Sequence, residues 1–237
     1  MYIQITTYCG MRCPHCIFSC GTKAIRPEHM TREVFDLCLE AADGCNITLG
    51  GGEPTDHPKF WEFFGLAVGT ADHVWMATNG KNTDLVMALA GLSYSEGKFK
   101  LALSQDEWHD PIMPQVIDKC MSMDVDIHTV HQISNNGTAR ESGCSTKNAC
   151  DCGGTFIRPN GDILPCACDD APVLGNIKIN GIEAVTSLTS ALGDIDDRCH
   201  REWDDDDIRV LKFDHGIDVP DNEYYTPSEI TEEDEEE

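Results

Sequence analysis

Three cysteines near the start of the chain have a spacing that suits iron–sulfur chemistry. Cys9, Cys13 and Cys16 follow a short apolar segment in the pattern C-x3-C-x2-C. Three thiolates on one tight loop can each ligate one iron of a 4Fe–4S cube, which leaves the fourth iron free to bind a substrate or cofactor. Zinc is the alternative, because Cys20 could supply the fourth ligand that a zinc site normally has. Otherwise we expect Cys20 to be a spare thiol and His15 to pack or hydrogen-bond beside the cluster.

The composition is that of a globular protein rich in cysteine. The chain has 237 residues, of which 41% are hydrophobic and 13 are cysteines. No stretch approaches the ~20 apolar residues of a membrane helix, and the first residues lack the features of a secretory signal. We therefore expect a soluble, cytoplasmic protein with no membrane association. In a reducing compartment its cysteines would serve metal ligation or catalysis rather than disulfides.

Negative charge is concentrated in the last third of the chain. The net charge of −25 divides into −7 over residues 1–150 and −18 over residues 151–237. Acidic stretches repel phosphate, so tight binding of a long nucleic acid is not expected. Residues 201–237 include "DDDD" at 204–207 and end in "TEEDEEE". We expect this region to be a largely disordered acidic tail with little regular structure, because like charges resist compaction.

Short β-rich segments alternate with helical segments up to about residue 132. The expected strands are 2–6, 45–50, 73–80, 98–104 and 125–130, and the expected helices are 32–42, 59–68, 83–91 and 111–122. This alternation indicates βα units and a parallel sheet, and so an α/β fold. A sixth strand is expected within residues 130–160, and one more helix at 181–192.

A glycine–glutamate motif follows the second expected strand. Gly51, Gly52 and Glu53 belong to "GGEP". Glycines allow the backbone to approach a ligand closely, and a carboxylate can accept hydrogen bonds from an ammonium group. With the cysteine loop after the first strand, this motif resembles the radical SAM superfamily, and the resemblance covers roughly residues 1–132.

The resemblance implies both a fold and a chemistry. The implied fold is a partial (β/α)6 TIM-like barrel, open at one side, over residues 1–140. The three cysteines would ligate a 4Fe–4S cluster whose open iron chelates S-adenosylmethionine (SAM). Reductive cleavage of SAM would give a 5′-deoxyadenosyl radical that abstracts hydrogen from a substrate. A low-potential electron donor such as flavodoxin or ferredoxin is implied as a partner.

Polar residues at the ends of the third and fourth strands extend the resemblance. They are Asn79 in "ATNG" and Ser104 and Asp106 in "LSQDEWHD". Asp106 and His109 are the candidate catalytic residues, although His109 could equally be a surface histidine and Asn79 part of a turn. The residues expected to bind SAM are Gly51, Gly52, Glu53, Asn79 and Ser104. Further candidates for a base or radical quencher, which the sequence does not rank, are Cys20, His57 and His131.

A second cysteine group lies on two β-like pieces joined by the turn signal "PNGD". Its expected ligands are Cys150, Cys152, Cys166 and Cys168, and Cys144 could replace one of them. The pattern resembles the SPASM and twitch modules, which implies an auxiliary 4Fe–4S cluster in a small unit over residues 141–200. Four thiolates also bind zinc well, so a structural zinc site is the alternative. No role is predicted for Cys199.

The substrate is less constrained than the reaction. The resemblance to SPASM and twitch proteins favours hydrogen abstraction from a peptide or protein side chain, and the acidic C-terminal region could recruit a basic partner. A nucleotide or modified base is the second hypothesis, within a wider set of small-molecule substrates. A non-catalytic zinc or iron–sulfur binding protein is the alternative of a different class.

Overall fold

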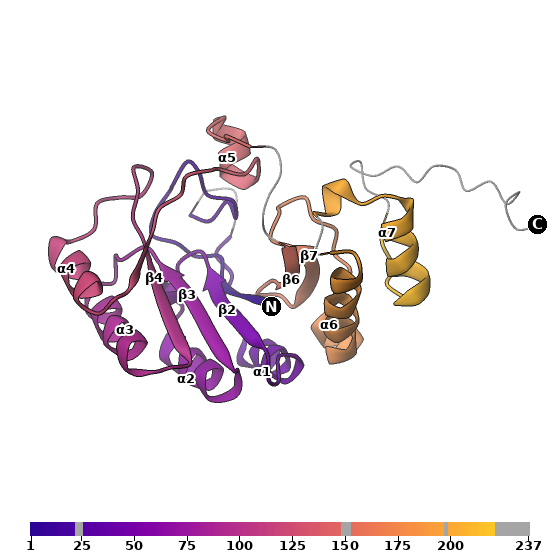
Figure 1. The fold of residues 1–237 in the computed structure, drawn as a ribbon, viewed down its shortest axis with the longest axis horizontal. Coiled ribbons are helices and arrows are strands. Elements are labelled where there is room, and N and C mark those ends of the chain that lie inside the picture. Colours follow the sequence, from indigo (N-terminus) through magenta and orange to yellow (C-terminus); the bar gives the residue numbers. More distant parts are fainter. Residues whose placement is uncertain (22–25, 148–152, 197–198, 221–237) are drawn as a thin grey trace, which may run out of the picture.

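The computed structural model describes residues 1–21, 26–147, 153–196 and 199–220, and within them the strands form one sheet (Figure 1). The strands are β1 (Tyr2–Thr6), β2 (Asn46–Gly51), β3 (His73–Thr78), β4 (Phe99–Ser104), β5 (Asp126–His128), β6 (Gly153–Ile157), β7 (Asp162–Cys166) and β8 (Gly175–Asn176). The α-helices are α1 (Arg32–Ala41), α2 (Phe60–Thr70), α3 (Thr83–Ser95), α4 (Pro114–Ser122), α5 (Gly137–Ser142), α6 (Ile177–Asp194) and α7 (Asp205–Arg209). Two short 3-10 helices, η1 (Pro54–Asp56) and η2 (His200–Glu202), and a π-helical turn, η3 (Val210–Asp214), complete the description.

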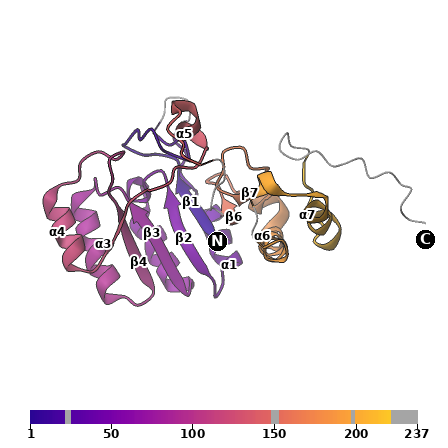
Figure 2. The same cartoon turned by 45° about the horizontal axis from the view of Figure 1, so that its top comes forward.

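The sheet has the order β5-β4-β3-β2-β1-β6-β7-β8. Strands β1 to β5 pair in parallel, as the βα alternation predicts. In both views α3 and α4 lie toward the β4 end of the sheet, whereas α6 lies beside β6 and β7 and α7 lies beyond α6 (Figures 1 and 2). The predicted α/β fold is therefore confirmed, with the loops after β1 to β5 at one edge of the sheet.

The first helix illustrates why the sequence forms these elements. Thr31 caps α1 by accepting a hydrogen bond from the backbone N–H of Val34 at 3.4 Å. Its apolar side chains at helical spacing, including Phe35 and Cys38, are fully buried against the sheet. The remaining predicted strands and helices up to residue 128 also form, and their ends differ from the expected ones by a few residues.

Strand β6 joins the sheet at its β1 edge. In a barrel whose strands follow chain order, it would instead lie next to β5. Strand β6 pairs in parallel with β1, so that Tyr2 lies opposite Phe156 and Ile3 lies opposite Ile157. The rings of Tyr2 and Phe156 stack with their centroids 4.9 Å apart. The antiparallel hairpin β6–β7 therefore continues the main sheet.

Two apolar clusters lie on the two faces of the extended sheet. The larger cluster joins the strands to the helices and includes Ile3, Leu49 and Leu103. The smaller cluster is formed by Phe156, Leu164, Cys166, Cys168 and Ala171. Because adjacent residues of a strand point to opposite faces, Ile157 belongs to the first cluster and Phe156 to the second.

The expectation of little regular structure beyond residue 200 is wrong for residues 200–214. Asp204 and Asp207 form a capping box at the start of α7, with hydrogen bonds of 3.0 and 3.1 Å between each carboxylate and the other residue's N–H. Trp203, Ile208 and Leu211 are buried in the larger apolar cluster. The acidic run therefore begins a helix that packs on the core. The predicted tail over 221–237 lies outside the described residues.

Helix α6 contains the expected helix at 181–192 and extends it at both ends, with a kink at Gly181. Among the described residues, no helix has both the length and the apolar character that a membrane-crossing segment requires.

The capping box makes a testable contribution to stability. We expect Asp204→Ala to lower the free energy of unfolding by about 1 kcal/mol, because the N–H of Asp207 loses its acceptor. Urea unfolding would measure the change, and hydrogen exchange would show it in residues 205–214. Asp206→Ala is the matched control, since Asp206 is an acidic residue of the same turn whose side chain is 90% exposed. Equal effects of the two substitutions would contradict a role for the cap.

Candidate functional site

A cavity of about 700 Å³ lies at the carboxyl ends of β1 to β5. Carboxyl ends of parallel strands are where α/β folds gather ligand-binding side chains. The lining includes nine of the residues predicted from the sequence: Cys9, Cys13, Cys16, Gly51, Gly52, Glu53, Asn79, Ser104 and His109. The structure therefore brings the separate strand-end motifs to one place.

The cysteine loop follows β1 directly. Cys9 accepts hydrogen bonds at its Sγ from the backbone N–H of Met11 at 3.4 Å and from the amide of Asn79 at 3.7 Å. The sulfurs of Cys9, Cys13 and Cys16 do not all lie within 4.8 Å of one another. On a single tetrahedral zinc ion, with Zn–S bonds of about 2.3 Å, thiolate sulfurs would be about 3.8 Å apart. The three thiols facing the cavity thus suit a group larger than one ion, as a 4Fe–4S cube is.

The loop thiols differ in their acidity. Burial raises the pKa of Cys9 to about 11 and the pKa of Cys13 to about 12. A hydrogen bond from the side chain of Cys20 lowers the pKa of Cys16 to about 7. The same hydrogen bond, together with burial, raises the pKa of Cys20 far above its usual range. Cys20 is therefore a neighbour of Cys16 at the cavity, and iron ligation would have to displace the protons of Cys9 and Cys13.

The two glycines of the glycine–glutamate motif allow the end of β2 to approach the cysteine loop. A Cβ atom on Gly51 would collide with the carbonyl oxygen of Thr6, and one on Gly52 would collide with that of Tyr8. Gly51 also has a φ of 154°, which favours glycine. The N–H groups of Gly52 and Glu53 donate to Thr6 and Tyr8 at 2.7 and 2.8 Å. The close approach that the sequence suggested for a ligand is thus made, in the structure, to the protein's own backbone.

Glu53 connects the ends of β2 and β3. Its Oε1 accepts hydrogen bonds from the N–H of Thr55 at 3.1 Å, the hydroxyl of Thr55 at 2.6 Å and the hydroxyl of Thr78 at 2.8 Å. Its Oε2 accepts a hydrogen bond from the N–H of Asn79 at 2.8 Å. The residue is 1% exposed, and burial raises the pKa of its carboxyl group against the lowering effect of these donors. The carboxylate therefore fixes the backbone of the residues that line the cavity.

Asn79 and Ser104 occupy the ends of the third and fourth strands. Asn79 uses its backbone N–H for Glu53 and its side-chain amide for Cys9, and its Oδ1 accepts a hydrogen bond from the N–H of Lys81 at 3.0 Å. Ser104 is the last residue of β4, lies opposite His128 in the neighbouring strand and lines the cavity. Both residues are placed where a ligand in the cavity could contact them.

Asp106 and His109 form a cluster with His15. Asp106 accepts hydrogen bonds from Nδ1 of His109 at 2.7 Å and from the N–H of Trp108 at 2.9 Å. Although burial opposes it, these donors lower the pKa of the Asp106 carboxyl group. The ring of His15 lies edge-on to that of His109, 4.7 Å away, and burial lowers the pKa of His15. Asp106 thus orients His109, and His109 is the member of the predicted catalytic pair that faces the cavity.

The other candidate bases differ in whether they line the cavity. Cys20 and His131 line the cavity. His57 does not: its Nε2 contacts the carbonyl oxygen of Met30 at 3.2 Å, and its Nδ1 accepts a hydrogen bond from the N–H of Lys59 at 3.1 Å. These contacts identify His57 as a buried residue that joins the loops around α1 and α2.

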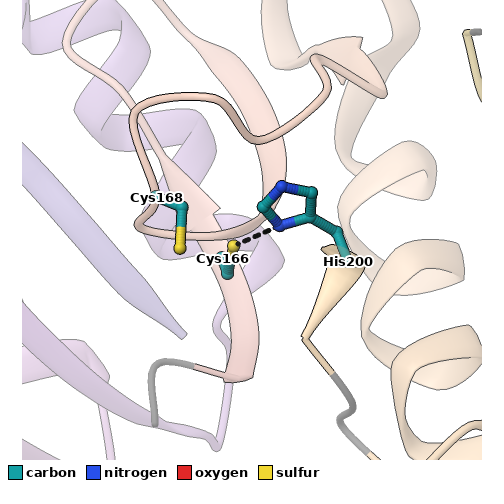
Figure 3. A group of neighbouring side chains, drawn as sticks. All are labelled: Cys166, Cys168 and His200. Carbon is teal, nitrogen blue, oxygen red and sulfur yellow. Dashed lines mark hydrogen bonds between the residues drawn. The ribbon is translucent and has the colours of Figure 1, made fainter. Parts of the chain in front are cut away.

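The second candidate metal group lies away from the cavity, and it includes a histidine that was not predicted from the sequence. Cys166 and Cys168 lie with His200, and their ligand atoms are all within 4.8 Å of one another (Figure 3). Cys150 and Cys152, which were predicted as ligands, lie outside the described residues. Cys144 lies beside the first loop instead, where its thiol donates to the carbonyl oxygen of Pro14 at 3.1 Å.

The signal for His200 was its position next to Cys199, since both residue types ligate metals. Thirty residues separate this pair from Cys168, and only the folded chain brings the two together.

Comparisons with known proteins find relatives in sequence and in fold. No family model matches the chain. Mycofactocin maturase MftC of Mycobacterium tuberculosis (strain CDC 1551 / Oshkosh) is 34% identical over 115 residues, which are 46% of this chain and 29% of that protein. MftC of Mycolicibacterium smegmatis is 29% identical over 140 residues, which are 56% of this chain and 34% of that protein. The chain thus spans about a third of the length of these curated relatives.

The fold is also that of a solved structure, BtrN in complex with AdoMet and 2-DOIA. The similarity covers 84% of this chain and 87% of that chain, with a TM-score of 0.60 and 17% sequence identity. This similarity shows that the two chains share a fold.

The buried position of Glu53 predicts a stability effect. We expect Glu53→Gln to lower the free energy of unfolding by about 1–3 kcal/mol, because the new amide N–H₂ would face the N–H of Asn79, where the carboxylate now accepts. Chemical denaturation would measure the change. Glu40→Gln on the exposed surface of α1 is the control. Equal stability of the two variants would show that the four hydrogen bonds to Glu53 contribute nothing net.

Proposed function

We propose that the chain, a member of the radical SAM superfamily, cleaves SAM reductively and uses the resulting radical to abstract hydrogen from a peptide or protein side chain. The observation that carries the proposal is the convergence of Cys9, Cys13 and Cys16 with Asn79 and the other strand-end residues on one cavity. A zinc or iron–sulfur protein without catalysis would not need this arrangement around an open cavity.

The cofactors fit the residues that are present. The three cysteine side chains would hold a 4Fe–4S cluster, and the cavity of about 700 Å³ offers room for a small molecule beside them. When bound, the cluster and SAM supply an electron-transfer reaction that yields a 5′-deoxyadenosyl radical. The protein's contribution is to bind and orient the reactants and to limit the access of water.

Each cavity residue has a distinct proposed role. Glu53 acts through its hydrogen bonds to Thr78 and Asn79, which it holds at the cavity wall, and Oε2, with one protein donor, keeps capacity for a ligand ammonium group. Asn79 positions Cys9, and Ser104 contacts SAM. His109, oriented by Asp106, is the candidate proton carrier for the substrate.

Two observations favour a peptide or protein substrate. The curated relatives carry the name maturase, which denotes processing of a precursor. The chain's net charge of −25 favours association with a basic partner. The electron would come from a low-potential donor protein, flavodoxin or ferredoxin.

The cluster ligands give the primary test. Protein reconstituted without oxygen, with SAM and dithionite, should produce 5′-deoxyadenosine. The triple variant Cys9→Ala/Cys13→Ala/Cys16→Ala should lose this product completely, because no ligand remains for the cluster. Cys45→Ser is the control and should retain the product, since Cys45 is an exposed cysteine just before β2. Chromatography of the nucleoside product provides the measurement.

A protein that binds about four irons at this loop yet forms no 5′-deoxyadenosine would refute the proposed reaction. Product formation that depends on an added basic peptide would support the substrate class, and dependence on a nucleotide would replace it.

The role of Ser104 is tested separately. We expect Ser104→Ala to raise the KM for SAM roughly five-fold, since loss of one hydrogen bond costs about 1 kcal/mol. The rate of 5′-deoxyadenosine formation over a range of SAM concentrations measures this. Ser95→Ala, at the exposed end of α3, is the control. An unchanged KM would remove Ser104 from the SAM site.

A further inference from the structure

The structure places the ligand atoms of Cys166, Cys168 and His200 within 4.8 Å of one another. We propose that these residues, with the neighbouring Cys199 as fourth ligand, hold one tetrahedral divalent ion of the zinc type rather than an iron–sulfur cube. This ligand set differs from the one that the cysteine spacing predicted. It uses residues from the end of β7, the turn that follows it and the start of η2.

The ligand atoms of Cys166, Cys168 and His200 converge near one point, as a single ion requires. Sγ of Cys166 lies 3.2 Å from Nδ1 of His200, and Sγ of Cys168 is within 4.8 Å of both (Figure 3). The side chain of Cys168 is hydrogen-bonded to Cys166 and to Cys199, and Cys199 is hydrogen-bonded to His200. Tetrahedral zinc, with bonds of about 2.3 Å to sulfur and about 2.0 Å to nitrogen, would place such atoms about 3.5–3.8 Å apart.

The first cysteine group provides an internal comparison. Cys9, Cys13 and Cys16 surround a cavity and their sulfurs do not all lie within 4.8 Å, whereas the ligand atoms of Cys166, Cys168 and His200 do, with Cys199 hydrogen-bonded at the edge of this group. A cube carries each ligand on a different iron, so its thiolates are spread more widely than those on one ion. The wider spacing of the first group therefore suits a cluster, and the closer spacing of the second group suits a single ion.

The chemistry of the ligands also favours zinc. Three cysteines with one histidine are an established structural zinc set, whereas cubes are held mainly by thiolates. His200 is fully buried, and its second nitrogen, Nε2, lies 3.4 Å from Oδ1 of Asp170. Carboxylates commonly hold metal-bound histidines in this way, since they orient the ring and fix its tautomer.

An ion pair lies beside the proposed ligands. Three thiolates and a neutral imidazole would leave one negative charge on a divalent ion. The guanidinium of Arg201 lies beside Cys168 and Cys199 and forms a 2.7 Å ion pair with Asp170. The side chain of Arg201 is only 14% exposed, so little water screens this charge.

The site is closed, which indicates a structural role. The exposed fractions of the four ligands are 0–9%, and none of them lines the cavity at the strand ends. An ion here would join the β6–β7 hairpin to η2, and so to the segment whose Trp203 and Leu211 pack in the main core. Metal binding would then stabilise the docking of residues 199–219 on the sheet.

Metal analysis of the Cys9→Ala/Cys13→Ala/Cys16→Ala variant tests the proposal without interference from the first cluster. We expect about one zinc per chain and no visible absorption from an iron–sulfur cluster, even after anaerobic reconstitution with iron and sulfide. In the same background, Cys166→Ala and His200→Ala should lose the zinc, and Cys45→Ser should retain it. About four irons per chain, lost on substitution of Cys166, would overturn the proposal.

Two further variants keep the test decisive if the alanine variants fold poorly. His200→Cys preserves a ligand and should retain about one metal ion, with stronger thiolate-to-metal charge transfer in the cobalt-substituted protein. Cobalt without the absorption of tetrahedral thiolate coordination would contradict the geometry. Cys150→Ala/Cys152→Ala should also keep its zinc, and zinc loss in that variant would contradict the ligand set.

Separate measurements test the role of Asp170 and the structural role of the ion. Asp170→Asn should weaken zinc affinity roughly 10–100-fold, measured by competition with a chromogenic chelator. Removal of zinc should increase hydrogen exchange in residues 199–219 more than in β3. Unchanged exchange in that segment would show that the ion does not hold it on the sheet.

Discussion

The buried carboxylate of Glu53 is the interaction on which the arrangement of the candidate active site depends. It receives hydrogen bonds from Thr55, Thr78 and Asn79, and the adjacent Gly52 packs directly on the backbone of the cysteine loop. One carboxyl group thereby connects the ends of β2 and β3, next to the loop after β1. An acidic side chain removed from water requires such donors, so the residues around it are held in one arrangement.

The parallel sheet explains how motifs far apart in sequence become one site. Each βα unit returns the chain to the same edge, so the residues after successive strands become neighbours. Cys9 and Asn79 are 70 residues apart, yet their side chains are in contact. His57 lies outside the cavity, where its ring contacts the loops before α1 and α2.

The C-terminal part of the described chain depends on a different kind of stabilisation. It combines a hairpin that pairs with β1, an acidic helix start and the proposed metal site at His200. The carboxylates of Asp204 and Asp207 are acceptors for backbone N–H groups at the start of α7. Local hydrogen bonding and the burial of Trp203 therefore outweigh the repulsion expected from the net charge of this region.

The sequence by itself determined the α/β architecture, the positions of the first five strands and the three-cysteine loop, because these follow from local periodicity and from residue spacing along the chain. Only the tertiary structure decided that β6 pairs with β1, that Glu53 is held by four protein donors, and that His200 lies beside Cys166. The physical reason is that strand pairing, burial and ligand convergence are set by contacts between distant segments. Periodicity and spacing carry no information on those distances.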